Sequence, residues 1–109
     1  MDIEQLRDYC MAKSDVEECL PFGPENLVFK VNGKMFLLVS LDQQPVRFNV
    51  KCDPEKAIEL REQYACVQPG YHMNKKLWNT VIIDGTLSSK QLSEFIDHSY
   101  ELVLKGKKK

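Results

Sequence analysis

The chain lacks the long apolar runs and clustered glycines that mark several common protein classes. No apolar run approaches the roughly 20 residues that a membrane-spanning helix needs. The acidic start, residues 1–4, lacks the basic and apolar regions of a signal peptide. The five glycines are scattered, so no phosphate-binding loop is predicted. We therefore expect a cytoplasmic protein that stays off the membrane and uses no cofactor.

Metal-binding and catalytic motifs are also missing. No two of the four cysteines form a C-x-x-C pair, so they are expected to be reduced thiols rather than zinc ligands. No H-E-x-x-H or nucleophile-elbow motif is present. His98 follows Asp97, but neighbouring residues of a helix point apart, so this pair predicts no proton-transfer site. We therefore predict a non-enzymatic protein without a metal site.

The charge is nearly balanced overall but unevenly distributed. Fifteen basic and 16 acidic residues give a net charge of −1. Residues 105–109 contain four lysines, which leaves the rest of the chain at −5. Residues 65–80, in contrast, contain Lys75 and Lys76 and no acid. A polyanion such as DNA could therefore bind only at a local basic patch.

Apolar periodicity and turn residues predict an α+β domain: an antiparallel sheet with helices packed on one face. Three helices are expected over residues 2–13, 53–64 and 89–104. Strands are expected over residues 27–31, 34–40, 46–51 and 77–83, with a short strand or turn at 65–70. Residues 14–26 contain two prolines and a glycine, so they are predicted to be a connector, with Leu20 and Phe22 packed on the core. Residues 1–104 would form one domain, and residues 105–109 a disordered basic tail.

Two turns set the predicted register of the first three of these strands. Asn32-Gly33 is a strong two-residue hairpin signal, and it places Phe29 opposite Phe36. A five-residue second loop, residues 41–45, would then place Phe48 opposite Leu38. This register puts the three phenylalanines on one buried face.

The same register leaves an apolar strip on the outer face of the sheet. The strip consists of Met35, Leu37 and Val39, and Lys30, Arg47 and Lys51 lie along its edges. An exposed apolar strip requires a cover or a partner. It therefore indicates a possible docking surface for a protein partner.

Basic and hydrogen-bonding side chains also suit contact with nucleic acid. Two groups are candidates: Lys30, Lys34, Arg47 and Lys51 on the hairpins, and His72, Asn74, Lys75 and Lys76 in the loop before Trp78. Lysines and arginines neutralise phosphates, and a loop histidine or asparagine can donate hydrogen bonds to them. Trp78 begins a strand and is expected in the core.

Three segments resemble the MmcQ/YjbR-like family of small bacterial proteins. They are Tyr9-Cys10-Met11-Ala12-Lys13, the stretch Pro69-Gly70-Tyr71-His72-Met73-Asn74-Lys75-Lys76-Leu77-Trp78-Asn79-Thr80-Val81, and Asp97-His98-Ser99-Tyr100-Glu101. The resemblance implies a CyaY-like, double-wing fold and a presumed role in DNA binding. The related frataxin-like fold also suggests weak iron binding by an acidic N-terminal ridge. In this chain those acids are spread around a helix and a connector, which does not favour a shared site.

Two hypotheses follow. In the leading one, a monomer binds duplex DNA through two hairpin wings and the basic loop. In the alternative, a protein partner docks on the outer strip of the sheet. Both describe a binding protein without catalytic residues.

Overall fold

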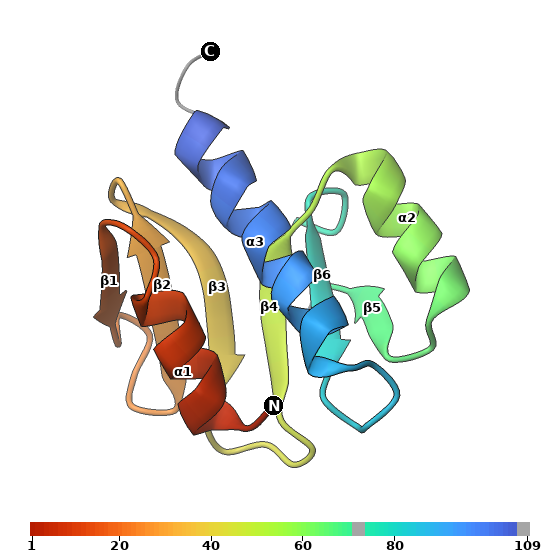
Figure 1. Ribbon diagram of the computed structural model, residues 1–109, viewed down its shortest axis with the longest axis horizontal. Helices are drawn as coiled ribbons and strands as arrows, with labels where there is room; N and C mark the ends of the chain where they lie inside the picture. Colours follow the sequence, from red (N-terminus) through yellow and green to blue (C-terminus); the bar gives the residue numbers. More distant parts are fainter. Residues whose placement is uncertain (71–73, 107–109) are drawn as a thin grey trace.

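A six-stranded antiparallel sheet with helices on one face forms the molecule (Figure 1). The computed structural model describes residues 1–70 and 74–106. The strands, in the spatial order β1-β2-β3-β4-β6-β5, are β1 (Val16–Cys19), β2 (Asn26–Val31), β3 (Lys34–Ser40), β4 (Arg47–Lys51), β5 (Val67–Pro69) and β6 (Trp78–Ile82). The helices are α1 (Ile3–Met11), α2 (Pro54–Gln63) and α3 (Ser89–Gly106). The predicted α+β class, with an antiparallel sheet and helices on one face, is confirmed.

The helices begin at residues that satisfy their free backbone N–H groups. The Asp2 carboxylate accepts a hydrogen bond from the Gln5 backbone N–H at 2.8 Å, and the Asp2 N–H donates one to the Gln5 side-chain oxygen. Asp53 caps α2 ahead of a proline at the first helical position. Ser88 and Gln91 exchange the reciprocal bonds of the predicted capping box. Local sequence therefore determines where these helices start.

The three helices form a single layer over the sheet, with α3 running diagonally across its middle (Figure 1). The core lies between the two layers, and its members Leu6, Ile96, Phe29 and Phe48 are completely buried. The last helix continues to Gly106, two residues past its expected end. Within residues 1–70 and 74–106, no helix combines the length and apolar character needed to cross a bilayer.

The strand register differs by one residue from the predicted one. Phe29 lies opposite Leu37, not Phe36, and Phe48 lies opposite Val39, not Leu38. The loop between β3 and β4 covers residues 41–46 and is one residue longer than expected. The β2–β3 ladder also shifts between Phe29 and Lys30, which leaves Phe36 as an extra, bulged residue on β3.

The bulge explains why the prediction for the phenylalanines is right although the register is wrong. At a bulge, two consecutive residues oppose one residue of the partner strand. Phe36 and Leu37 are both fully buried, and both belong to the core with Phe29 and Phe48. Val39 is fully buried in the same core.

The outer strip predicted as a docking surface therefore does not exist. Of its three residues, Leu37 and Val39 face the helices, and only Met35 remains partly exposed. The predicted connector was also wrong in two respects. It contains the edge strand β1, and its Leu20 and Phe22 side chains are 50% and 61% exposed instead of packed on the core.

A buried hydroxyl joins the middle helix to two strands. The β3–β4 ladder pairs residues 37–39 with residues 48–50. At the next position, the Ser99 hydroxyl donates to the Phe36 carbonyl oxygen at 2.5 Å and accepts from the Lys51 N–H at 2.8 Å. Ser99 is completely buried. Its side chain thus supplies the hydrogen bonds of two backbone groups where the ladder stops.

Replacing Ser99 with alanine should destabilise the domain by about 2 kcal/mol, because two backbone groups near the core lose their partner. Chemical denaturation of the variant and the wild type measures this difference. The matched control is Ser89→Ala, an exposed position at the start of the same helix, which should change stability by less than about 0.5 kcal/mol. Equal losses for the two variants would show that the Ser99 bridge contributes little.

Candidate nucleic-acid interface

Most of the basic residues predicted on the β-hairpins lie on the face of the sheet opposite the helices. Cross-strand partners share a face, and the core residues identify the helix side. Lys30 lies opposite Met35, Arg47 opposite Ile82, and Lys51 opposite Trp78, all on the helix-free face. Lys34 is opposite the core residue Val31 and therefore lies on the helix side, away from the other three.

Charge is segregated between the two sides of the molecule. The three helices and the N-cap residues Asp2 and Asp53 contain ten acidic and five basic side chains. Among the described strand residues on the helix-free face, three are basic and one, Glu17, is acidic. The acidic side chains of the helix layer disfavour a polyanion there, so contact with one is expected on the opposite face.

A groove opens on this face between the ends of β3, β4, β5 and β6. Its free volume is about 330 Å³. Its lining residues are Ser40, Gln43, Arg47, Asn49, Gln68, Pro69 and Thr80. One of them is basic, five are polar and uncharged, and none is acidic.

The floor of the groove is a buried polar pair. Asn49 and Thr80 lie opposite each other on β4 and β6 and are 7% and 4% exposed. The Thr80 hydroxyl donates to the Asn49 side-chain oxygen. In the wall beside this pair, the Arg47 Nε is buried and has no hydrogen-bond partner among the residues that the structure describes. A buried N–H without a partner costs free energy.

The described part of the basic loop is held by its own contacts. The Arg61 guanidinium of α2 donates to the Lys75 carbonyl and, at 2.7 Å, to the Asn79 side-chain oxygen. The Lys75 Nζ donates to the Gly70 carbonyl at 3.3 Å, and the Asn74 side chain accepts from the Lys76 N–H. Two of the predicted binding side chains, Lys75 and Asn74, thus have structural partners within the loop. The side chain of Lys76 extends from an exposed position.

One predicted contact, His72, lies outside the described residues. The expectation that Trp78 lies in the core is wrong, since this side chain is half-buried on the helix-free face beside Lys51. A Cβ on Gly70 would come within 2.8 Å of the Trp78 Cβ, so the close approach of β5 to β6 requires glycine there.

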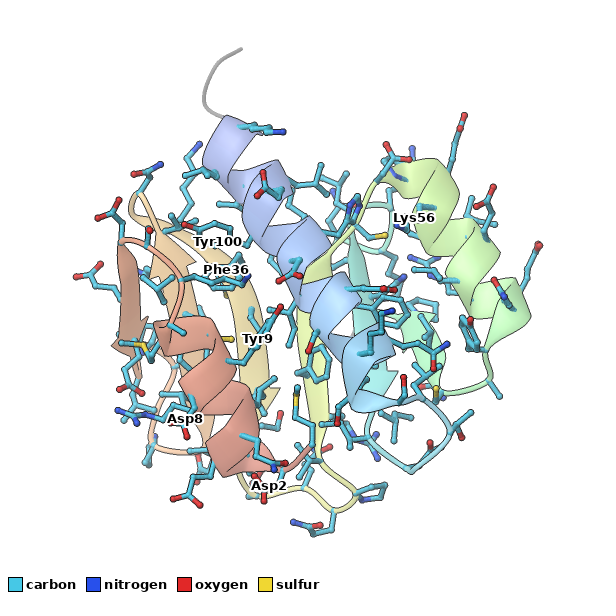
Figure 2. All side chains as sticks on the ribbon, in the orientation of Figure 1. Asp2, Asp8, Tyr9, Phe36, Lys56 and Tyr100 are labelled. Atoms are coloured by element: carbon cyan, nitrogen blue, oxygen red, sulfur yellow. The ribbon has the colours of Figure 1, made fainter. Side chains whose placement is uncertain are left out.

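The terminal segments singled out in the sequence meet on the other side, between α1 and α3. The Tyr9 hydroxyl and the Lys13 ammonium both bond to the Asp97 carboxylate, at 2.6 and 2.5 Å. The Tyr100 hydroxyl donates to the Ser14 carbonyl at 2.7 Å. Burial, followed by the bond to Asp97, raises the pKa of Tyr9 to about 12. Figure 2 shows Tyr9 and Tyr100 on the helix side of the sheet, where these contacts join α1 to α3.

His98 connects α3 to the start of α2. Its Nε2 accepts a hydrogen bond from the Asp53 backbone N–H at 3.2 Å, which requires that nitrogen to be unprotonated. Burial, and then the nearby Lys56 ammonium, lower the His98 pKa from its ordinary value of 6.5. The residue therefore stabilises the fold in its neutral form.

This shift predicts a pH-dependent contribution to stability. Because the folded pKa is the lower one, the contribution is complete above about pH 6.5 and is lost as the pH falls through the folded pKa. Urea-unfolding midpoints measured from about pH 8 to about pH 5 should fall more steeply for the wild type than for His98→Gln. Parallel pH profiles for the two proteins would contradict this role of His98.

Several groove residues carried no signal of their own in the sequence. The β4 segment Arg47-Phe48-Asn49-Val50-Lys51 alternates polar and apolar residues, which places Arg47 and Asn49 on the outer face. Gln68 and Thr80 come together with them only because β6 pairs with β4 and β5 pairs with β6. Those pairings bridge a helix and a loop, and no turn signal specifies them.

Comparison with known proteins places the chain among small bacterial domains. The family model described as YjbR matches residues 11–102. The uncharacterized protein YbdF of Escherichia coli O157:H7 is 43% identical over 91 residues, which cover 84% of this chain and 75% of that protein. The uncharacterized protein YjbR of Escherichia coli K12 is 35% identical over 101 residues, which cover 93% and 86%.

Solved structures share the fold. The crystal structure of Deinococcus radiodurans protein DR2400, with its DUF419 domain, matches with a TM-score of 0.90 and 41% identity, over 94% of this chain and 78% of that one. The crystal structure of a Pseudomonas syringae protein matches with a TM-score of 0.82 and 29% identity, over 94% and 99%. The likeness therefore extends over the sheet and the helices.

Proposed function

Because the chain belongs to the YjbR family, as its sequence motifs suggested, and because one face of its sheet is free and basic, we propose that it binds DNA on that face. It would do so as a monomeric binding protein without catalytic activity. The observation that supports this proposal is the segregation of charge: acidic helices on one side, and Lys30, Arg47 and Lys51 on the other.

The spacing of these basic side chains suits a sugar–phosphate backbone. Arg47 and Lys51 begin and end β4 on the same face, four residues apart. At about 3.3 Å per residue, their backbone positions are separated by about 13 Å. With β4 parallel to the duplex axis, this distance would span about four phosphate steps of one strand, at about 3.4 Å of axial rise for each. Lys30, two strands away, adds a contact to the side of this line.

In this proposal the two β-hairpins are the wings that contact DNA. The β2–β3 hairpin carries Lys30 and the β3–β4 hairpin leads into Arg47. Lys76 is exposed in the loop that precedes Trp78, and in this proposal it adds a further phosphate contact. Lys34 and Lys75 are left out of this surface, since the first lies on the helix side and the second is bonded within its loop. The protein-docking alternative is left without its surface, because Leu37 and Val39 are buried.

The salt dependence of duplex binding tests the proposal. Each phosphate contact contributes about 0.9 to the slope of log affinity against log salt, so Lys30→Gln/Lys51→Gln should reduce the slope by about two. Fluorescence anisotropy with a labelled duplex at several salt concentrations measures it. The control, Lys34→Gln/Lys90→Gln, removes two charges from the helix side and should leave the slope unchanged.

Both double variants should also be compared in a chain that ends at residue 106, because lysines 107–109 can bind DNA without specificity. The proposal is rejected if the wild type does not bind duplex DNA at low salt. It is also rejected if the two double variants reduce the slope by the same amount. Binding would then depend on the total charge of the protein and not on the basic residues of this face.

A further inference from the structure

The lining of the groove on the helix-free face indicates what it can hold. Its volume of about 330 Å³ lies at the lower end of the range of small-ligand sites. Arg47 supplies the only positive charge among the seven lining residues, and no carboxylate opposes it. The side chains of Gln43, Gln68 and Asn49 each carry an amide, which offers both donors and an acceptor.

This mixture suits a nucleobase better than a bare phosphate. A phosphate accepts hydrogen bonds and donates none at neutral pH, so it would use only the NH2 donors of Gln43 and Gln68 and leave their oxygens unused. A base edge carries donors and acceptors side by side, and amide side chains match that pattern. A nucleobase is therefore a complementary ligand for these neutral amide side chains.

Arg47 favours a nucleobase that presents two adjacent hydrogen-bond acceptors. The guanidinium fork matches the O6 and N7 atoms of guanine, which is the commonest specific arginine–base contact. The Nε of Arg47 is buried beside the groove and has no partner among the described residues. The β4–β6 ladder, where Arg47 lies opposite Ile82, fixes the backbone from which this side chain extends.

A base must leave its duplex to enter this groove. Bases of a duplex are stacked and paired, whereas single-stranded segments can present an unstacked base to a protein pocket. Trp78 is half-buried on the same face, at the other end of β6 from the groove, and offers an aromatic surface for a second base. Both features favour a single strand over a duplex.

We infer that the groove between Arg47, Gln43 and Gln68 binds an unpaired guanine of a single-stranded nucleic acid. This inference rests on the proposed function, because the strand's phosphates would use the basic residues of the same face. It adds a binding site for one base, with Asn49 and Thr80 as its floor. The protein would then bind single strands that contain guanine more tightly than the matching duplex.

The test uses a labelled 12-nucleotide strand with one central guanine, the same strand with an abasic site at that position, and the duplex of the first strand. The wild type should bind the guanine strand roughly tenfold more tightly than the abasic strand. In Gln43→Ala/Gln68→Ala the two strands should bind alike. Both glutamines are exposed, so this variant keeps the fold and the charge of the face.

A second variant tests the fork of Arg47 without changing its charge. Arg47→Lys should also abolish the preference for the guanine strand, because an ammonium lacks the paired donors. The control Gln63→Ala lies at the end of α2 on the helix side and should keep the wild-type preference. Unfolding midpoints of all variants establish that each one is folded.

The outcomes separate this inference from the proposed function. If the guanine and abasic strands bind the wild type equally, or if the glutamine double variant keeps the preference, the guanine site is wrong. In that case, duplex binding with the salt dependence expected for Lys30 and Lys51 would still support the proposal that DNA binds on the basic face. If neither strand nor duplex binds at low salt, both the site and the proposed function are rejected.

Discussion

The buried hydroxyl of Ser99 is the contact on which the arrangement of the two layers depends. It bonds to β3 at Phe36 and to β4 at Lys51, where the ladder between those strands ends. The Phe36 ring, bulged toward the helices, packs edge-on against Tyr100 with a centroid distance of 5.3 Å. Figure 2 shows these two residues next to each other, beside α3. The helix is thereby fixed across the middle of one face, and the opposite face stays free.

This constraint divides the molecule into a structural side and a binding side. Most of the conspicuous polar residues of the terminal segments, Tyr9, Lys13, Asp97 and His98, hold α1, α2 and α3 together. Their partners are already within the protein, so they are poor candidates for ligand contact. The helix-free face differs, because it combines three basic side chains, Lys30, Arg47 and Lys51, with a polar groove. The proposed function and the guanine site both lie there for that reason.

The local features of the fold could be predicted from the sequence, and the features that depend on distant pairing could not. Helix caps and the Asn32-Gly33 turn are encoded by neighbouring residues and were predicted correctly. The register failed because a bulge at Phe36 and one extra loop residue left the pattern of apolar residues almost unchanged. The predicted register therefore places Leu37 on the outer face of the sheet, whereas in the structure Leu37 is buried. The groove needs β4, β5 and β6 side by side, and only the folded structure brings Gln68 to Arg47.

The central claim is that binding occurs on the helix-free face while the helix side serves as scaffold. A map of backbone amide chemical shifts, recorded as a guanine-containing single strand is added to the full chain, tests it most directly. We expect the largest changes in β4, β5 and β6, around Arg47, Gln68 and Thr80, and little change in α1 or at Asp97. Changes centred on α1 and α3, or no change at low salt, would contradict the account.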